Sequence, residues 1–381
     1  MKILFLSWEN FCTEGMAAAF RKLGHEVIFL DTNQEELLCP RIGERLGRAA
    51  AETGADLLFG FNYFPEAAKK AADIGLDYYS WVYDNPCVQL YSHTVLLPTN
   101  HIFVFDSDTY FRFHSQGIEN IRFLPMAASP VPDAGCLATG RFHNDIAFIG
   151  TLYSESHNFY ERMMKKGIPD RTSGYIRGVM ESQKILYGTN LTEDLLTDRV
   201  IDEMHKALPL EPGADSVITK RTLFAEYVIN RQITAEERSD LLSMLGDRFG
   251  NIALYTADRN VRIPGIINKG KADPYKEAPA IYNSTRINLN ISLRSIVNGI
   301  PLRCFEIMGS AGFLMSSYAG DFSAFFVDGQ DYVSFDSPEA LADRCAYFLL
   351  HEDERNEIAG NGWKKIKSAH TFVHRAAEML A

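Results

Sequence analysis

The strongest constraint on this chain is an alternation of strand-like and helix-like segments that runs through about 130 residues and then starts again. Short apolar runs typical of strands lie at residues 2–6, 25–30, 56–61, 78–83, 101–105 and 121–124. Segments with helical spacing separate some of them, at residues 14–23, 65–72 and 109–115. Because parallel strands must be joined by crossover connections, this spacing predicts a parallel sheet covered by helices on both faces.

A proline-rich segment then interrupts the pattern. Residues 124–133 read LPMAASPVPD, with further glycines at positions 135 and 140, a composition that favours an extended linker. Strand-like runs resume at residues 144–151, 251–256, 287–291, 312–316 and 332–335. We therefore predict an α/β fold with two tandem Rossmann-like, doubly wound parallel-sheet domains, at residues 1–133 and 144–381.

Residues 167–246 do not follow this alternation. They read as several consecutive helices, which predicts a helical insertion in the second domain. Thr234, followed by Ala-Glu-Glu, matches a capping-box pattern and predicts a helix start. Two roles stay open for the insertion, which are shaping the functional site and forming a contact between copies of the chain. Helices are also predicted at residues 157–166, 275–283, 302–309, 338–350 and 352–369.

Composition excludes several functional classes. The 381 residues exceed one ordinary core, in agreement with two domains. A net charge of -11 argues against a nucleic-acid partner, which needs a basic surface, whereas a nucleotide needs only a few local cations. No run approaches the roughly 20 apolar residues of a membrane-spanning helix, and Glu9 interrupts the N-terminal apolar run, so we expect a cytoplasmic protein. The six cysteines have no metal-site spacing, and we expect no metal.

The most informative loop lies between residues 291 and 306. In open parallel sheets, ligands bind beyond the carboxyl ends of strands, and with two domains the cleft between them is the default site. This loop follows a strand, turns at Asn298 and Gly299, and enters a helix with Pro301 in its first turn. Since a helix N-terminus carries free N–H groups and partial positive charge, the loop predicts a diphosphate site.

Three charged side chains accompany this helix start. Arg294 and Arg303 can add charge-assisted hydrogen bonds to phosphate oxygens. Glu306, three residues after Arg303, can accept hydrogen bonds from the vicinal hydroxyls of a ribose. A local surface ion pair between Arg303 and Glu306 explains the same spacing equally well.

Other strand-end loops supply weaker candidates. In the second domain, Gly150 and Thr151 would let a backbone approach a ligand, although a simple turn explains them as well; further candidates for a base and a phosphate are Tyr255, Thr256 and Lys269. Aromatic residues beside carboxylates at residues 7–10 and 81–86 suit sugar recognition. In the first domain, Asp84 and Asp106 follow strands and are candidate general bases, with helix capping as the alternative role.

The loop also carries a family resemblance. The run at residues 287–314, INLNISLRSIVNGIPLRCFEIMGSAGFL, resembles the glycosyltransferase domain of the CgeB-type (spore-maturation-like) proteins. Residues 352–359 and 370–375 are similar to the closing helices of that domain, so the resemblance covers about residues 250–380. The first half, through residues 81–86 and 123–125, resembles the N-terminal domain that usually accompanies it.

This resemblance implies a GT-B fold and a glycosyltransferase that needs no metal. The C-terminal half would bind a nucleotide-sugar donor, most often a UDP-sugar, and the N-terminal half a glycan, protein or small-molecule acceptor. Related enzymes carry two glutamates separated by seven residues, of which the second holds the ribose. Glu306 matches the second, whereas Asn298 replaces the first, which leaves the stereochemical outcome open. The leaving diphosphate would be neutralised by Arg294, Arg303 and the backbone near Gly299.

Two other functional classes stay open. A nucleotide-sugar epimerase or a phosphorylase shares the two-sheet architecture. A non-catalytic protein of a spore coat or surface layer could use the same fold as a scaffold, and the replacement at Asn298 keeps this alternative open. No GxSxG, HExxH, Walker A or DFG-type motif supports a hydrolase, a metalloprotease or a kinase.

Overall fold

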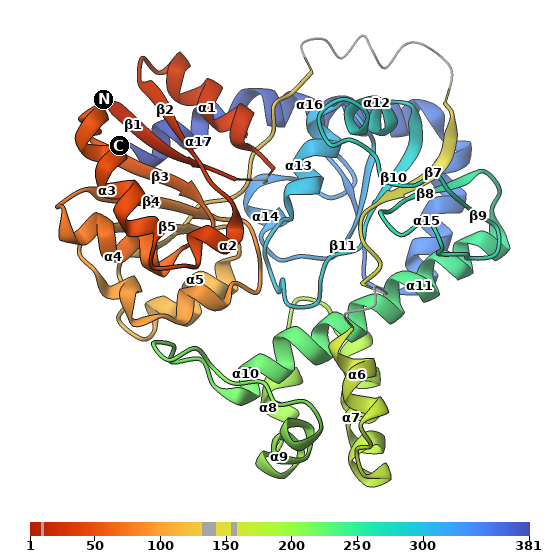
Figure 1. Cartoon of the computed structure of the whole chain (residues 1–381). Helices are drawn as coiled ribbons and strands as arrows, with labels where there is room; N and C mark the ends of the chain where they lie inside the picture. Colours follow the sequence, from red (N-terminus) through yellow and green to blue (C-terminus); the bar gives the residue numbers. More distant parts are fainter. Residues whose placement is uncertain (9–10, 132–141, 154–157) are drawn as a thin grey trace.

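The computed structural model describes residues 1–8, 11–131, 142–153 and 158–381, and shows two parallel sheets side by side with a helical lobe below them (Figure 1). The first sheet has the order β2-β1-β3-β4-β5-β6. Its strands are β1 (Lys2–Ser7), β2 (Glu26–Asp31), β3 (Leu57–Phe61), β4 (Asp77–Val82), β5 (Asn100–Val104) and β6 (Ile121–Phe123). All six strands predicted for this half are confirmed.

The second sheet is also parallel and has the order β12-β11-β10-β7-β8-β9. Its strands are β7 (Asn144–Ile149), β8 (Ile252–Tyr255), β9 (Ile266–Asn268), β10 (Thr285–Asn290), β11 (Leu314–Ser317) and β12 (Val333–Phe335). Counted from β7, this is the 3-2-1-4-5-6 order of dinucleotide-binding folds. The predicted α/β architecture of two doubly wound sheets is confirmed. The short edge strand β9 was not predicted.

Helices cover both faces of the first sheet. They are α1 (Thr13–Lys22), α2 (Gln34–Leu37), α3 (Ile42–Thr53), α4 (Pro65–Asp73) and α5 (Ser107–His114), with 3₁₀ turns η1 (Val88–Tyr91) and η2 (His93–Leu96). Successive strand residues point to opposite faces, so Phe5 and Phe59 belong to one apolar cluster and Leu4 and Leu58 to another. The sequence did not predict α2 and α3, whose buried apolar stripe is short.

The helices of the second sheet include one that returns to the first. They are α12 (Ala278–Asn283), α13 (Leu302–Gly309), α14 (Phe322–Phe325), α15 (Pro338–Leu350), α16 (Glu352–Ala369) and α17 (Phe372–Met379). Helix α17 packs against α1, and the backbone N–H of Ala128 donates to the carbonyl of His370 at 3.1 Å. The last helix therefore ties the two sheets together, as the closeness of the two termini shows in Figure 1.

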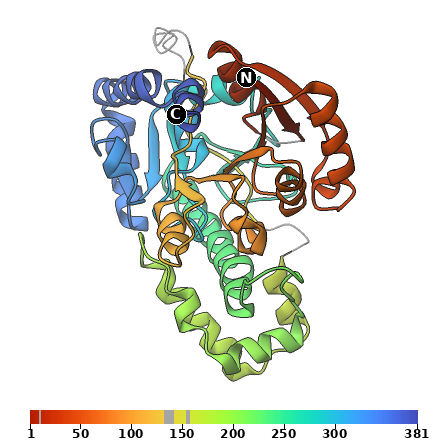
Figure 2. The ribbon, with the colours of Figure 1, turned by 90° about the vertical axis from the view of Figure 1, so that its left-hand side faces the viewer.

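The helical lobe lies below both sheets and has its own core (Figure 2). It consists of α6 (Phe159–Lys165), α7 (Asp170–Lys184), α8 (Thr192–Leu195), α9 (Asp198–Ala207), α10 (Lys220–Leu223), a π-helical turn (Phe224–Ile229) and α11 (Asn230–Arg248). The helical insertion predicted at residues 167–246 is thus present. The helix start predicted at Thr234 is wrong, because Thr234 lies inside α11 and its hydroxyl donates to the carbonyl of Asn230 at 2.8 Å.

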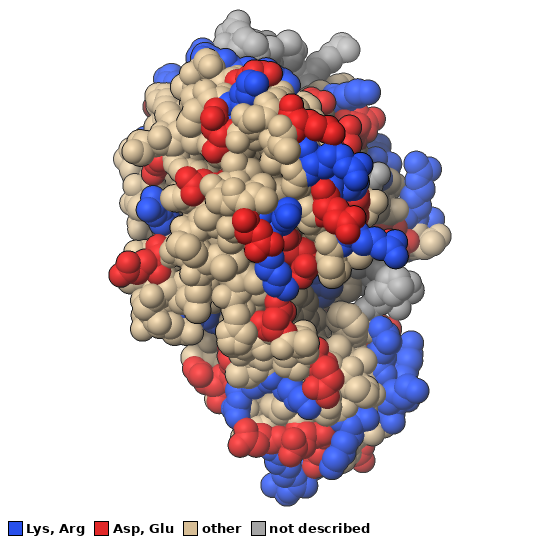
Figure 3. Space-filling model, turned by 60° about the vertical axis from the view of Figure 1, so that its left-hand side comes forward, with Lys and Arg blue, Asp and Glu red and all other residues tan. Residues whose placement is uncertain are grey.

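Several sequence predictions fall on residues outside the described ranges, namely the loop residues 9–10, the linker residues 132–133 with the glycines at 135 and 140, and position 157. The domain bounds 1–133 and 144–381 stay predictions. On the face drawn in Figure 3, acidic and basic side chains are interspersed over the helical lobe. Among the described helices, none combines the length and the apolar character that crossing a membrane requires.

Candidate active site

The candidate site lies where the carboxyl ends of the two sheets face each other. Each sheet has a switch point, which lies between two neighbouring strands whose connections leave in opposite directions. The loops after these two strands diverge, and ligands bind in the space between them. These strands are β1 and β3 in the first sheet, and β7 and β10 in the second. A cavity of about 430 Å³ lies beside the loops that follow β3, β7 and β10, and it is lined by Asn62, Thr151, Arg303 and other residues of both halves. We call it the arginine cavity.

The first-sheet wall of this cavity carries a carboxylate held by an asparagine. Asn62, just after β3, has a left-handed φ of 60°, and its side-chain oxygen accepts hydrogen bonds from the backbone of Tyr83 and Asp84. Its amide nitrogen donates to the Asp84 carboxylate at 2.7 Å. Removal from water raises the pKa of Asp84, and the Asn62 hydrogen bond opposes that rise. Asp84 therefore lines the cavity in a fixed orientation.

The opposite wall carries three arginines, and two aromatic rings pack against them, Tyr153 in the wall itself and the buried Phe148 behind it. Arg231 and Arg238 both come from α11, and Arg303 comes from α13. The guanidinium carbons of Arg231 and Arg238 lie 5.1 and 5.0 Å from the ring centre of Tyr153. Those of Arg238 and Arg303 lie 5.3 and 5.7 Å from the ring centre of Phe148. We call this row the arginine ladder, and its positive charge suits an anionic ligand.

Arg238 connects the two strands at the switch point. Its guanidinium donates to the carbonyl of Thr151, after β7, at 2.7 Å and to the carbonyl of Ile291, after β10, at 3.0 Å. Burial, together with the nearby charge of Arg303, lowers the pKa of Arg238 to about 10. Two cations held side by side in this way stabilise a bound anion.

Helix α13 begins at the edge of the cavity, as the sequence predicts. Pro301 is its N-cap residue, and Pro301 and Arg303 line the arginine cavity. Gly150 leaves room for the Arg303 guanidinium, because a Cβ at position 150 would lie 3.2 Å from its Nη2 atom. Gly150, Thr151 and Arg303, predicted separately from the sequence, thus lie together.

Glu306 faces a second, neighbouring cavity. This space of about 390 Å³, the Glu306 cavity, is lined by Cys12 and Gly15 of the first half and by Tyr275, Tyr282 and Glu306 of the second. Burial raises the pKa of Glu306, and Arg303 opposes that rise. The first turn of α13 lines both cavities, so Arg303 and Glu306 lie on either side of one short stretch of helix. The surface ion pair between Arg303 and Glu306, which the sequence spacing left open, is not among the ion pairs formed by the described residues.

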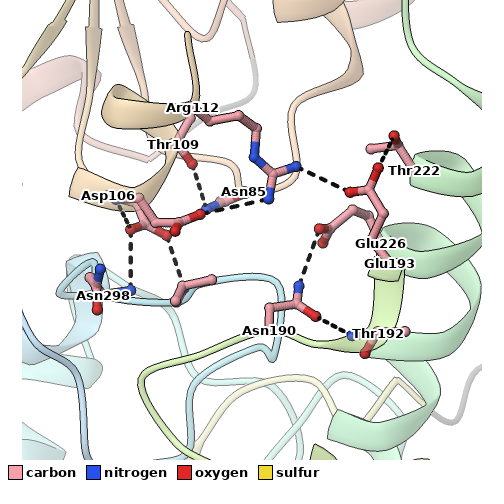
Figure 4. Close-up of polar contacts among 12 residues, drawn as sticks. Asn85, Asp106, Thr109, Arg112, Asn190, Thr192, Glu193, Thr222, Glu226 and Asn298 are labelled. Atoms are coloured by element: carbon pink, nitrogen blue, oxygen red, sulfur yellow. Dashed lines mark hydrogen bonds and ion pairs between the residues drawn. The ribbon is translucent and has the colours of Figure 1, made fainter. Parts of the chain in front are cut away.

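Asp106 lies beside the site and joins the two halves (Figure 4). It caps α5, and its carboxylate accepts backbone hydrogen bonds from Val297 at 2.9 Å, Asn298 at 3.2 Å and Gly299 at 3.1 Å. Burial raises the pKa of Asp106 to about 7, although these backbone donors oppose the rise. The catalytic role predicted for Asp106 stays a prediction, and its contacts favour a structural one, since its side chain is 1% exposed.

The two turn residues serve the same junction. At Gly299, a Cβ would lie 2.8 Å from the Cβ of Asp106, so glycine permits the close approach of the two halves. The side chain of Asn298 points toward Gly320, whose added Cβ would lie 2.7 Å from its Oδ1 atom. In the part of the chain that the structure describes, neither Asn298 nor Gly299 lines the arginine cavity or the Glu306 cavity.

Arg294 is turned away from the site. Its guanidinium pairs with both carboxylate oxygens of Glu237, at 2.8 and 2.6 Å, and donates to the carbonyls of Lys184 and Leu186. It also stacks on Tyr187 and is 8% exposed. Sequence spacing predicted a phosphate ligand, but the helical lobe supplies partners for this guanidinium, and it does not reach the arginine cavity.

The remaining candidates also lie apart from both cavities. The Tyr255 hydroxyl contacts the side chain of Asn144 at 3.5 Å, toward the opposite end of the sheet. Thr256 is buried after β8, and Lys269 is exposed after β9. Their binding roles stay predictions that neither cavity supports. Among the described residues, no group of His, Cys, Asp or Glu is arranged to hold a metal ion.

Sequence reasoning missed Arg231 and Arg238. Both lie in a segment to which no chemical role was assigned, because it interrupts the strand–helix alternation. Their spacing of seven residues places them on one face of a helix, which is a usable signal only once the helix is known to border a site.

Comparison with known proteins agrees with this geometry. Residues 242–381 match the family described as Glycosyl transferase-like, whereas no protein of curated function matches the sequence. Sucrose-phosphate synthase from Thermosynechococcus elongatus superimposes with a TM-score of 0.56 at 11% identity, covering 100% of this chain and 97% of that one. A glycosyltransferase from Rickettsia africae gives a TM-score of 0.55 at 9% identity, covering 100% of this chain and 96% of that one.

A third structure was solved with a ligand. HepE from Anabaena, in complex with UDP-glucose, gives a TM-score of 0.55 at 10% identity, covering 100% of this chain and 98% of that one. At such identities these superpositions establish the fold, which is that of GT-B glycosyltransferases. The chain therefore has a GT-B fold, and its residues 242–381 are similar to the Glycosyl transferase-like family.

Proposed function

We propose that this protein transfers a sugar from a UDP-sugar to a hydroxyl acceptor without a metal ion. The observation that carries the proposal is the first turn of α13, which lines two adjoining cavities with a cation on one side and a carboxylate on the other. A nucleotide diphosphate needs both, because its phosphates seek cations and its ribose hydroxyls seek an acceptor. The UDP-glucose complex of HepE supports UDP as the nucleotide.

The donor would span the two cavities. Its ribose would donate hydrogen bonds to Glu306, and its base would lie against Tyr275 or Tyr282 in the Glu306 cavity. The diphosphate would lie at the N-terminus of α13, between Arg303 and Arg238. As the sugar–phosphate bond breaks, these two guanidinium groups would stabilise the charge that develops on the leaving diphosphate, which is the task a metal ion performs in other transferases.

The acceptor would enter from the first-sheet wall. Asp84 would accept the proton of the attacking hydroxyl, since it lines the arginine cavity and Asn62 holds its orientation. The acceptor domain is proposed at residues 1–133 and the donor domain at residues 144–381. Membership of the CgeB-type subfamily and a cytoplasmic location stay predictions.

Calorimetric titration with UDP tests the donor site. Glu306→Ala should weaken UDP binding by about 1–3 kcal/mol, because the ribose hydroxyls lose their acceptor. Glu357→Ala, which removes an exposed carboxylate from α16, is the matched control and should leave affinity unchanged. Equal affinity in both variants would remove Glu306 from the site.

Turnover separates transfer from the other classes. Release of UDP from UDP-glucose, undiminished by a chelator, is expected for a metal-independent transferase. UDP binding without turnover on any UDP-sugar offered would favour the scaffold alternative, and conversion of one UDP-sugar into another without UDP release would favour an epimerase.

A further inference from the structure

The arginine ladder is longer than a donor diphosphate requires. Its order along the cavity wall is Arg231, Tyr153, Arg238, Phe148, Arg303, with each guanidinium carbon 5.0–5.7 Å from the ring beside it. Arg231 and Arg238 are seven residues apart on α11, and so roughly 10 Å apart along its axis. The two phosphates of a diphosphate share a bridging oxygen, and they fit in the space between two neighbouring arginines of the ladder. If the diphosphate lies between Arg238 and Arg303, the space beside Arg231 is left for another group.

Arg231 is also the most exposed of the three arginines of the ladder. Arg238 is 4% exposed and bonded to two carbonyls, and Arg303 is enclosed by Gly150 and Phe148. Arg231 is exposed to the cavity, and it takes part in none of the ion pairs formed by the described residues. Arg177 of the lobe and Arg294, whose partner Glu237 comes from the lobe, are both paired with carboxylates. A guanidinium that lines a cavity and forms no ion pair with the described residues is suited to an anionic ligand.

The wall opposite Arg231 belongs to the acceptor side. Arg231 and Asp84 both line the arginine cavity, and the charge of Arg231 opposes the rise in the pKa of Asp84. Around Asp84 the cavity is lined by the side chains of Asn85 and Gln89 and by the ring of Tyr83. The Asn85 amide nitrogen already donates to Asp106, so the Gln89 amide and the Tyr83 ring are the groups offered to a sugar. Amides that bond hydroxyls beside an aromatic ring are typical of a sugar site.

We propose that the acceptor is a sugar that carries an anionic group, a phosphate or a carboxylate, and that Arg231 binds this group. The inference rests on the proposed function, since it takes the donor diphosphate to lie at Arg303. In this proposal the helical lobe contributes to acceptor recognition, because its helix α11 carries Arg231. A neutral sugar would leave Arg231 without a partner and would bind more weakly.

The test is calorimetry on the protein saturated with UDP, so that the diphosphate position is filled. The complex is titrated with glucose 6-phosphate, glucuronate and glucose, which separate a phosphate, a carboxylate and a neutral sugar. At least one anionic sugar should bind about tenfold more tightly than glucose. Arg231→Gln should abolish that preference while changing UDP affinity by less than about twofold. Arg248→Gln, at the exposed far end of the same helix, is the charge-matched control and should keep the preference.

Four results would overturn the inference. Anionic and neutral sugars could bind alike, or both arginine variants could lose the preference equally. Arg231→Gln could weaken UDP binding as strongly as Arg303→Gln, which would assign the whole ladder to the donor. An Arg231-dependent preference for UDP-glucuronate over UDP-glucose would place the anion on the transferred sugar. Absence of UDP binding in the wild-type protein would instead refute the proposed function. The titration of the protein with UDP alone, which precedes the titrations with sugars, reveals this separately.

Discussion

The two sheets of this molecule have nearly the same architecture and opposite chemistry. Each has six parallel strands and a switch point at the shared cleft. At the first sheet the cleft is lined by a carboxylate and several amides, and at the second by three arginines. The fold thus determines where a ligand can lie, and the loop and helix residues determine which part of it each half binds.

The helical lobe is the source of this difference. Residues between β7 and β8 form the lobe and contribute Arg231 and Arg238, whereas β1 and β2 are joined by α1 and short loops. The same lobe pairs Arg294 with Glu237 and so removes it from the cleft. An insertion in one sheet therefore both adds cations to the site and withdraws one.

The largest effect is expected for Arg294→Met, which tests whether this arginine is structural. The substitution leaves the buried Glu237 carboxylate without its cationic partner and with the Tyr187 hydroxyl as its remaining donor, and should lower the free energy of unfolding by about 3–5 kcal/mol. Denaturant unfolding measures this loss. UDP affinity of the folded variant should stay unchanged. A selective loss of UDP binding would show that Arg294 takes part in binding the nucleotide.

Gly299→Ala tests the junction that brings the two walls together. The new methyl group would lie 2.8 Å from the Cβ and 2.9 Å from the Cα of Asp106, and should destabilise the protein by about 1–3 kcal/mol. Gly250→Ala is the control, because nothing lies within 4 Å of the added atom. If both variants melt at the same temperature, the contact of Gly299 with Asp106 is looser than described.

Arg303→Lys tests the cation of the second-sheet wall. Lysine keeps the charge but does not reproduce paired hydrogen bonds to phosphate oxygens, so UDP affinity should fall by about 1–2 kcal/mol. Arg248→Lys serves as the control, and calorimetry measures both. An Arg303→Lys variant with full affinity and full activity would leave the α13 backbone as the main phosphate site.

The smallest effect concerns the carboxylate of the first-sheet wall. Asp84 accepts a proton only when ionised, and its pKa is raised, so the rate of transfer should fall with decreasing pH at values above the ordinary range of an aspartate. Asn62→Gly keeps the left-handed backbone but removes the hydrogen bond that lowers this pKa. The acidic limb of the pH–rate profile should then move to higher pH by less than about one unit. A move to lower pH would show that another group limits the rate.

The sequence by itself determined most elements of this protein, although it missed β9, α2 and α3 and placed a helix start wrongly at Thr234. Apolar periodicity and the position of Pro301 are local signals, and they placed both sheets and the start of α13 correctly. Spacing after Arg303 also indicated Glu306, which the family resemblance supported and which lines a cavity beside that helix. Strands and helix starts are set by residues close in the chain, which explains why these predictions succeeded.

Only the tertiary structure decided which charged groups face the cleft. Nothing in the spacing of Arg294 and Arg238 distinguishes a buried ion pair from a cavity-lining cation, because the difference depends on how the helical lobe packs. The same holds for Asp106, whose backbone partners lie about 190 residues away in the chain. The direction of a side chain is a property of long-range packing, and long-range packing is what a local pattern does not contain.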